Sequence, residues 1–95
     1  MTAPRAFARD PPLDASVAEL IGFGADEFER AGLAFGHGTG TALDDAAALV
    51  FHALGLDHDR AAELYDLRPD ASARAAVLAL FAERIGRRIP SAYLI

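Results

Sequence analysis

The chain has 95 residues, a length that accommodates one domain with a modest core. Hydrophobic residues make up 53% and charged residues 24% of the sequence, which excludes disorder along the whole chain. The nine basic residues are all arginine, cysteine is absent, and the net charge is −5. Without cysteine the chain forms neither disulfides nor thiolate metal sites, and we expect a cytoplasmic protein.

The charge also restricts the partners. A net negative surface repels nucleic-acid phosphates, so we expect no direct nucleic-acid binding, and a basic protein is the better electrostatic match. No apolar run reaches the roughly 18–20 residues that cross a bilayer. The first residues also lack a secretion signal, so no membrane partner is expected.

The amino-terminal third predicts a leader and a helix. Residues 1–13 contain three prolines, which disfavour helix, so we expect a flexible leader in which Phe7 packs locally. Ser16 and Glu19 have the spacing of a capping box, which predicts a helix that ends near Gly32. Its predicted inner face comprises Val17, Leu20, Ile21, Gly24, Phe28 and Ala31.

Two glycines, Gly22 and Gly24, lie inside this helix. Each weakens a helix by about 1 kcal/mol relative to alanine. We interpret them as positions that allow a neighbouring helix to approach closely.

A glycine-rich loop, Gly36–Gly40, separates the first helix from a second. Thr41 is the expected N-cap of the second helix, with Asp44 three positions on, and Gly55 is its expected end. The predicted inner face comprises Leu43, Ala47, Val50 and Leu54, with Ala46 and Phe51 at its edges.

The remaining sequence predicts a short helix and a long one. Asp57 or Asp59 caps a short helix that runs to Leu67 and is stopped by Pro69, with Leu64 and Leu67 buried and Tyr65 at the edge. Asp70 or Ser72 caps a last helix over 73–87, with an apolar stripe of Val77, Leu78, Phe81 and Ile85. Arg74, Glu83, Arg84 and Arg87 are expected to face outward or sideways. The fold class is therefore all-α, a small orthogonal bundle of four or five helices.

The end of the chain predicts a different conformation. Pro90 stops the last helix, and Ser91–Ile95 reads as an extended apolar run. We expect the natural chain to continue beyond it.

The spacing Gly36-x-Gly38-x-Gly40 superficially matches a cofactor-binding glycine loop. Such a loop follows a buried strand, whereas the preceding residues have a helical period. The acid expected before the first glycine falls at Ala34, and the dinucleotide variant requires glycine where the chain has Thr41. We therefore interpret the loop as a structural turn.

His37 lies within this loop. We interpret it as a turn residue whose ring packs against a helix end, with a contact to a partner or a further domain as the alternative. No cysteine and no well-placed acid supports a nucleophile or a proton relay here.

The remaining histidines do not predict a metal site. His52 and His58 are six residues apart, not the four that place two ligands on one helix face. Asp57–Asp59 begins like a calcium loop, but Ala62 and Arg68 occupy the positions of the required glycine and glutamate.

The charged clusters have an explanation in the helix dipole. Asp44 and Asp45 lie in the first turn of the second helix, where negative charge is stabilised. Arg84, Arg87 and Arg88 lie near the end of the last helix, where positive charge is equally favoured. An interface to a following domain is the alternative for these arginines.

Two segments resemble one family. Phe35–Thr39, followed by Asp44–Ala46 and Leu49–Val50, resembles the glycine–histidine–glycine–threonine loop and following helix of glutamine methyltransferases that act on large-subunit ribosomal protein L-three. Glu83–Leu94, with arginine, isoleucine and proline before an alanine–tyrosine–leucine run, is similar to the hinge of that family and of release-factor glutamine methyltransferases. The resemblance covers roughly residues 17–95.

The resemblance implies a division of labour. Residues 14–89 would be a helical domain that helps to choose the substrate, ribosomal protein L-three, and residues 90–95 a hinge into an absent catalytic domain. That domain would bind S-adenosylmethionine and hold the glutamine with an asparagine–proline–proline–tyrosine motif. Because the chain has no asparagine, this motif is missing, and we expect neither catalysis nor cofactor binding from the chain alone.

The resemblance leaves only candidate interface residues, towards the substrate or the parent's own catalytic domain. They are Gly36, His37, Gly38, Thr39, Arg84, Arg88, Pro90 and Tyr93. No catalytic, cofactor or metal-binding residue is predicted. A freestanding helical interaction or regulatory domain is the alternative.

Overall fold

The described part of the chain is entirely helical in its regular structure. The computed structural model describes residue 7, residues 11–33, residues 41–88 and residue 94. It contains α1 (Val17–Arg30), α2 (Ala42–Leu54), the 3-10 helix η1 (His58–Arg60), α3 (Ala61–Leu64) and α4 (Ala71–Arg87). No strand occurs in these residues, and the predicted all-α bundle of four or five helices is confirmed. The residues for which we predicted a loop at Gly36–Gly40, and most of those of the predicted carboxyl-terminal tail, lie outside the described residues.

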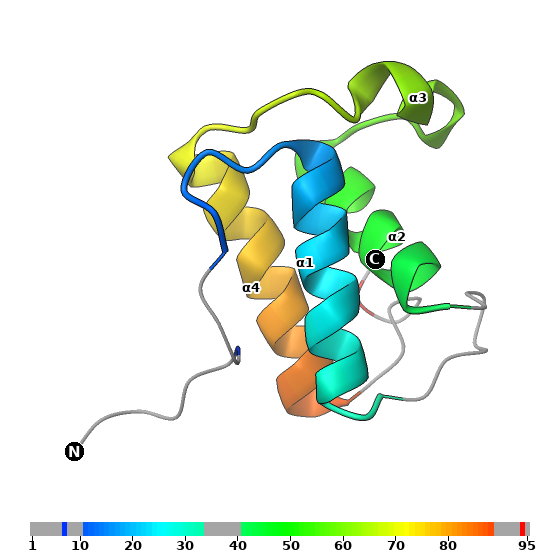
Figure 1. The fold of residues 1–95 in the computed structure, drawn as a ribbon, viewed down its shortest axis with the longest axis vertical. Helices are drawn as coiled ribbons and strands as arrows, with labels where there is room; N and C mark the ends of the chain where they lie inside the picture. The colour runs from blue at the N-terminus through cyan, green and yellow to red at the C-terminus, as the bar shows by residue number, and fades with distance from the viewer. Residues whose placement is uncertain (1–6, 8–10, 34–40, 89–93, 95) are drawn as a thin grey trace.

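The three long helices form the body of the bundle. α1 and α4 run side by side, and α2 packs against α1 and also contacts α4 (Figure 1). The short helix α3 lies at one end of the bundle, and the segment that follows it crosses this end to reach the start of α4 (Figure 1).

Side-chain caps begin each long helix, as the sequence predicts. The Ser16 hydroxyl accepts from the Glu19 N–H at 3.1 Å, and the Glu19 carboxylate accepts from the Ser16 N–H at 3.0 Å. The Thr41 hydroxyl accepts from the Asp44 N–H at 3.1 Å, and Asp70 caps α4 in the same way. These bonds satisfy N–H groups that have no partner within the helix.

The predicted glycine stops are also confirmed. Gly55 follows α2 with φ of 65°, and Gly32 follows α1 with φ of 70°. A side chain at either position would be strained in this left-handed conformation, which glycine adopts freely.

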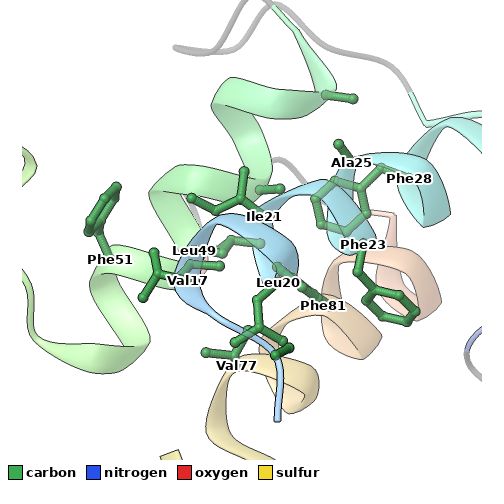
Figure 2. Packing of buried hydrophobic residues seen from close by; sticks show 14 of the residues in the cluster. Val17, Leu20, Ile21, Phe23, Ala25, Phe28, Leu49, Phe51, Val77 and Phe81 are labelled. Carbon is green, nitrogen blue, oxygen red and sulfur yellow. The ribbon is translucent and has the colours of Figure 1, made fainter. Parts of the chain in front are cut away.

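Phenylalanine rings from two helices and the leader form one end of the core. The Phe81 ring of α4 packs edge-on against Phe28 at 5.4 Å, and Phe7 packs edge-on against Phe23 at 5.2 Å. Figure 2 shows Phe23, Phe28 and Phe81 close together at this end. The buried apolar residues are Ala15, Val17, Leu20, Ile21, Phe23, Ala25, Phe28, Leu33, Ala42, Ala46, Leu49, Val50, Phe51, Val77 and Phe81. The predicted packing of Phe7 is confirmed.

One of the two α1 glycines lies at a close helix contact. A Cβ atom added to Gly24 would lie 2.4 Å from the Phe81 ring, whereas one added to Gly22 would have no neighbour within 4 Å. The interpretation of close approach is therefore confirmed for Gly24 and wrong for Gly22.

Two predicted core leucines face solvent instead. Leu43 is 57% exposed and Leu67 is 47% exposed. In α2 the buried face turns towards Ala42, Ala46 and Leu49, because several alanines leave the apolar face of this helix ambiguous until α1 and α4 pack on it.

The short helix ends earlier than predicted, at Leu64 rather than Leu67. The chain after it turns back onto α1, where the N–H groups of Val17 and Ala18 donate to the carbonyls of Leu67 at 2.8 Å and Tyr65 at 3.1 Å. The first N–H groups of α1 have no acceptor within their own helix, and the carbonyls of this connection serve as their acceptors.

Candidate functional site

The structure describes two of the eight predicted interface residues, Arg84 and Arg88. The other six, Gly36, His37, Gly38, Thr39, Pro90 and Tyr93, lie outside the described residues. The residues that flank them are described, and these show how the helix ends next to both motifs are held together.

Arg84 is part of a buried ion pair, so the prediction that it faces outward or sideways is wrong. Its Nε lies 2.8 Å from the Oδ2 of Asp45, and the two side chains are 3% and 1% exposed. The guanidinium also lies over the Phe28 ring, 5.9 Å from the ring centre. This one side chain of α4 therefore contacts both α2 and α1.

Arg88 ties the end of α4 to the end of α1. It adopts a left-handed backbone conformation, with φ of 54°, that is unusual for a residue other than glycine. Its Nη2 donates to the carbonyls of Ala31 at 2.8 Å and Gly32 at 3.3 Å. These bonds occupy free carbonyls at the end of α1 and hold the strained residue in place.

The two arginines thus bring together the helix ends next to the two motifs. Ala31 and Gly32 precede the Gly36–Thr39 loop in the chain and Asp45 follows it. Arg88 stands two residues before the predicted hinge, residues 90–95. α1 and α4 also end at the same end of the bundle (Figure 1). The described structure therefore fixes the helix ends that stand before and after the Gly36–Thr39 loop in the chain, and the helix end that stands before the hinge.

Asp45 is a residue of this arrangement that sequence reasoning missed. The helix dipole accounted for both Asp44 and Asp45, but only Asp44 stands at the N3 position of the Thr41 cap. Asp45 lies three residues after Ala42 and four before Leu49, on the buried face of α2. An acid on that face signals a buried cation, which a correct assignment of the face would have revealed.

Two surface hollows are formed by described residues. The first, which we call the Leu43 hollow, has a volume of about 270 Å³ and is lined by Ala18, Ile21, Leu43, Asp44, Ala47 and Tyr65. The second, the Leu67 hollow, has a volume of about 220 Å³ and is lined by Val17, Leu54, Leu56, Leu67, Arg68, Pro69 and Ala73. Both are smaller than typical small-molecule sites, which start at roughly 300 Å³, and their size suits a side chain of a partner.

Metal and membrane sites find no support in the described part of the chain. No group of three or more histidine, aspartate or glutamate side chains is placed there to hold a metal ion. The Asp57 carboxylate accepts from the Asp59 N–H at 2.9 Å, as an aspartate at a turn commonly does. Among the helices built from these residues, none is long and apolar enough to cross a membrane.

Comparison with known proteins gives a consistent set of relatives. The ribosomal protein uL3 glutamine methyltransferase of Xanthomonas campestris pv. campestris is 42% identical over 79 residues, which are 83% of this chain and 26% of the relative. The enzyme of the same name from Xylella fastidiosa (strain Temecula1) is 43% identical over 83% of this chain and 25% of its own length. That of Neisseria meningitidis serogroup B is 38% identical over 83% of this chain and 26% of its own length.

No family model matches the chain, and no solved structure is significantly similar to it. The similarity to the curated relatives nevertheless extends over 83% of the chain. The chain spans about a quarter of the length of these relatives. It belongs to the family of ribosomal protein uL3 glutamine methyltransferases, as the counterpart of their N-terminal part.

Proposed function

We propose that this chain is the substrate-recognition part of an S-adenosylmethionine-dependent methyltransferase, which modifies a glutamine side-chain amide of ribosomal protein uL3 in the cytoplasm. The observation that carries this function is the 42% identity over 79 residues to an enzyme named for that reaction. In this division of labour the helical bundle binds the substrate, and the remainder of the enzyme binds the cofactor and transfers the methyl group.

The charge of the chain supports a ribosomal protein as ligand. Proteins that bind ribosomal RNA present lysine and arginine to the phosphates, so their surfaces are basic. A chain of net charge −5 attracts such a surface and repels the RNA itself. Free ribosomal protein would therefore bind more readily than ribosomal protein already covered by RNA.

The contacts of Arg84 and Arg88 support a role of the bundle in positioning the substrate. The guanidinium of Arg84 joins α4 to α2, and that of Arg88 joins the end of α4 to the end of α1. A substrate bound on the helices would then lie in a fixed relation to whatever follows Arg88. We propose that Gly36–Thr39, Pro90 and Tyr93 contact the substrate or the catalytic part, on the strength of their resemblance to the family motifs.

The test is a calorimetric titration of the chain with uL3. We expect one molar equivalent to bind, and to bind at least tenfold more tightly than a second ribosomal protein of similar size and charge. Equal affinity for both proteins would contradict specific recognition of uL3.

A parallel titration with S-adenosylmethionine examines the division of labour. We expect no heat of binding from the chain alone. Stoichiometric binding of the cofactor would show that this part of the enzyme also holds the methyl donor, contrary to the proposed function.

A further inference from the structure

The Leu43 hollow combines features that the core of the bundle does not explain. It lies between α1, which contributes Ala18 and Ile21, and the start of α2, which contributes Leu43, Asp44 and Ala47. Tyr65, from the connection after α3, closes it. Leu43 and Asp44 also stand just after Thr41 in the chain, the residue that follows the candidate loop.

The walls of the hollow are held in place by the fold. The Ala18 N–H donates to the Tyr65 carbonyl at 3.1 Å, which fixes the connection against α1. The Tyr65 ring lies 6.5 Å from the ring of the buried Phe51. Ile21 is only 7% exposed, so the floor belongs to the core. A partner side chain would therefore enter a preformed site and would not have to order it, which lowers the entropic cost of binding.

The rim of the hollow presents large apolar side chains to solvent. Leu43 is 57% exposed and Tyr65 is 41% exposed, so neither side chain is buried in the core. Isolated exposed apolar residues are ordinary on protein surfaces, but two at the rim of one apolar hollow form a continuous surface for contact. A partner that covers this rim buries the apolar surface of both side chains, which favours binding.

The charge at the rim is negative. Asp44 lines the hollow, its side chain is exposed, and none of the ion pairs among the described residues includes it. The charged residue of the Leu67 hollow is instead Arg68, whose guanidinium lies 3.6 Å from the Glu19 carboxylate and 3.8 Å from the Asp14 carboxylate. Of the two hollows, the Leu43 hollow is therefore the one that is lined by an acid.

We propose that the Leu43 hollow is a docking site for the protein substrate: it takes one apolar side chain from a segment that places a lysine or arginine next to that side chain. The apolar group would contact Leu43, Tyr65 and Ile21, and the cation would pair with the Asp44 carboxylate at the rim. This assignment rests on the proposed function, and it names the part of the bundle that contacts the substrate.

Three variants test this site by titration with uL3. Leu43→Ser removes the apolar rim, and we expect its affinity for uL3 to fall by about tenfold or more, as for a central contact of a protein interface. Asp44→Asn keeps the size of the side chain and removes its charge; we expect a several-fold loss that disappears at high salt. Leu67→Ser is the matched control, a similarly exposed leucine at the other hollow, and should leave the affinity unchanged.

The outcomes separate this inference from the proposed function. If the unsubstituted chain binds uL3 and both Leu43→Ser and Asp44→Asn bind equally well, the hollow is not the docking site, while the proposed function stands. If the unsubstituted chain does not bind uL3, the proposed function fails and the inference fails with it. Circular dichroism verifies that each variant folds, and sedimentation measures its oligomeric state. If Leu43→Ser only converts a dimer to a monomer, the hollow joins two copies of the chain and the inference is overturned.

Discussion

The buried ion pair of Asp45 and Arg84 connects α2 to α4 inside the bundle. Both are almost fully buried, and the distance between Nε and Oδ2 is 2.8 Å. Burial of two charges has a large desolvation cost, which their attraction offsets only when the geometry is good. Loss of one partner of this buried pair therefore costs more stability than loss of one partner of a surface ion pair.

Removal of one partner should be far more harmful than removal of both. We expect Arg84→Met to lower the free energy of unfolding by about 3–5 kcal/mol, because it takes the guanidinium away from a buried carboxylate. The double variant Asp45→Leu with Arg84→Met should recover most of this loss. Urea unfolding followed by circular dichroism measures both; a double variant no more stable than Arg84→Met would contradict the explanation.

At the start of α1, Glu19 provides a pH-dependent contribution. The hydrogen bonds from the Ser16 backbone and side chain lower the pKa of Glu19 below its ordinary value of 4.5, with Arg68 adding a smaller effect. A carboxyl whose pKa is lower in the folded state stabilises that state above its unfolded pKa. This contribution is lost as the pH falls through the lowered folded value.

The variant Glu19→Gln isolates this contribution, because glutamine keeps a capping oxygen without the charge. We expect the chain to be more stable than Glu19→Gln at neutral pH, and the difference to shrink as the pH falls below 4.5. Urea unfolding of both proteins over a pH series measures it. A difference that stays constant down to the lowest pH at which both proteins fold would refute the role of the charge.

Among the elements, the contact between α1 and α4 depends on a residue without a side chain. Gly24 lets the Phe81 ring come so close that an added Cβ would be 2.4 Å from it. Phe81 cannot move away easily, because it is fully buried and packs against Phe28. Gly22, two residues earlier, has open space where its Cβ would be.

The two glycines provide a matched pair of substitutions. Gly22→Ala should stabilise the chain by about 0.5–1 kcal/mol, since alanine is the better helix former. Gly24→Ala gains the same propensity but overpacks the core, for a net loss of about 1–2 kcal/mol. Thermal and urea unfolding of both variants gives the comparison; stabilisation of similar size in both would show that the Gly24 contact is not tight.

The caps of the three long helices were predictable from the sequence because caps act locally. Ser16, Thr41 and Asp70 each accept a backbone N–H three residues on, so the signal and the structure lie within one turn. The end of α3 was not predictable, because the residues after Leu64 bond to α1, far away in the sequence. The caps thus specify where helices begin, and tertiary contacts decide how far the weak ones extend.

For the whole molecule, the net charge of −5 sets how a basic partner approaches. Opposite charges accelerate association, and salt screens them. Raising the ionic strength from about 0.01 M to about 1 M shortens the screening length from roughly 30 Å to roughly 3 Å.

We therefore expect the association rate with uL3 to fall strongly over this range of salt, while the dissociation rate changes less. Stopped-flow measurements of both rates provide the test, with Asp44→Asn as a variant that should show a weaker salt dependence. An association rate that is insensitive to salt would mean that the acidic surface does not guide the substrate.

The sequence alone determined the all-α class, the caps of the long helices, the turns at Gly32 and Gly55, and the family. Each of these depends on residues close together in the chain or on matching motifs. The tertiary structure decided which face of α2 is buried, and so placed Leu43 outside and Asp45 inside. It also pairs Asp45 with Arg84, 39 residues later in the sequence, and places the Arg88 guanidinium against the Ala31 carbonyl at the end of α1. Such choices depend on which helices pack together, because an alanine-rich helix offers nearly equivalent faces until its neighbours cover one of them.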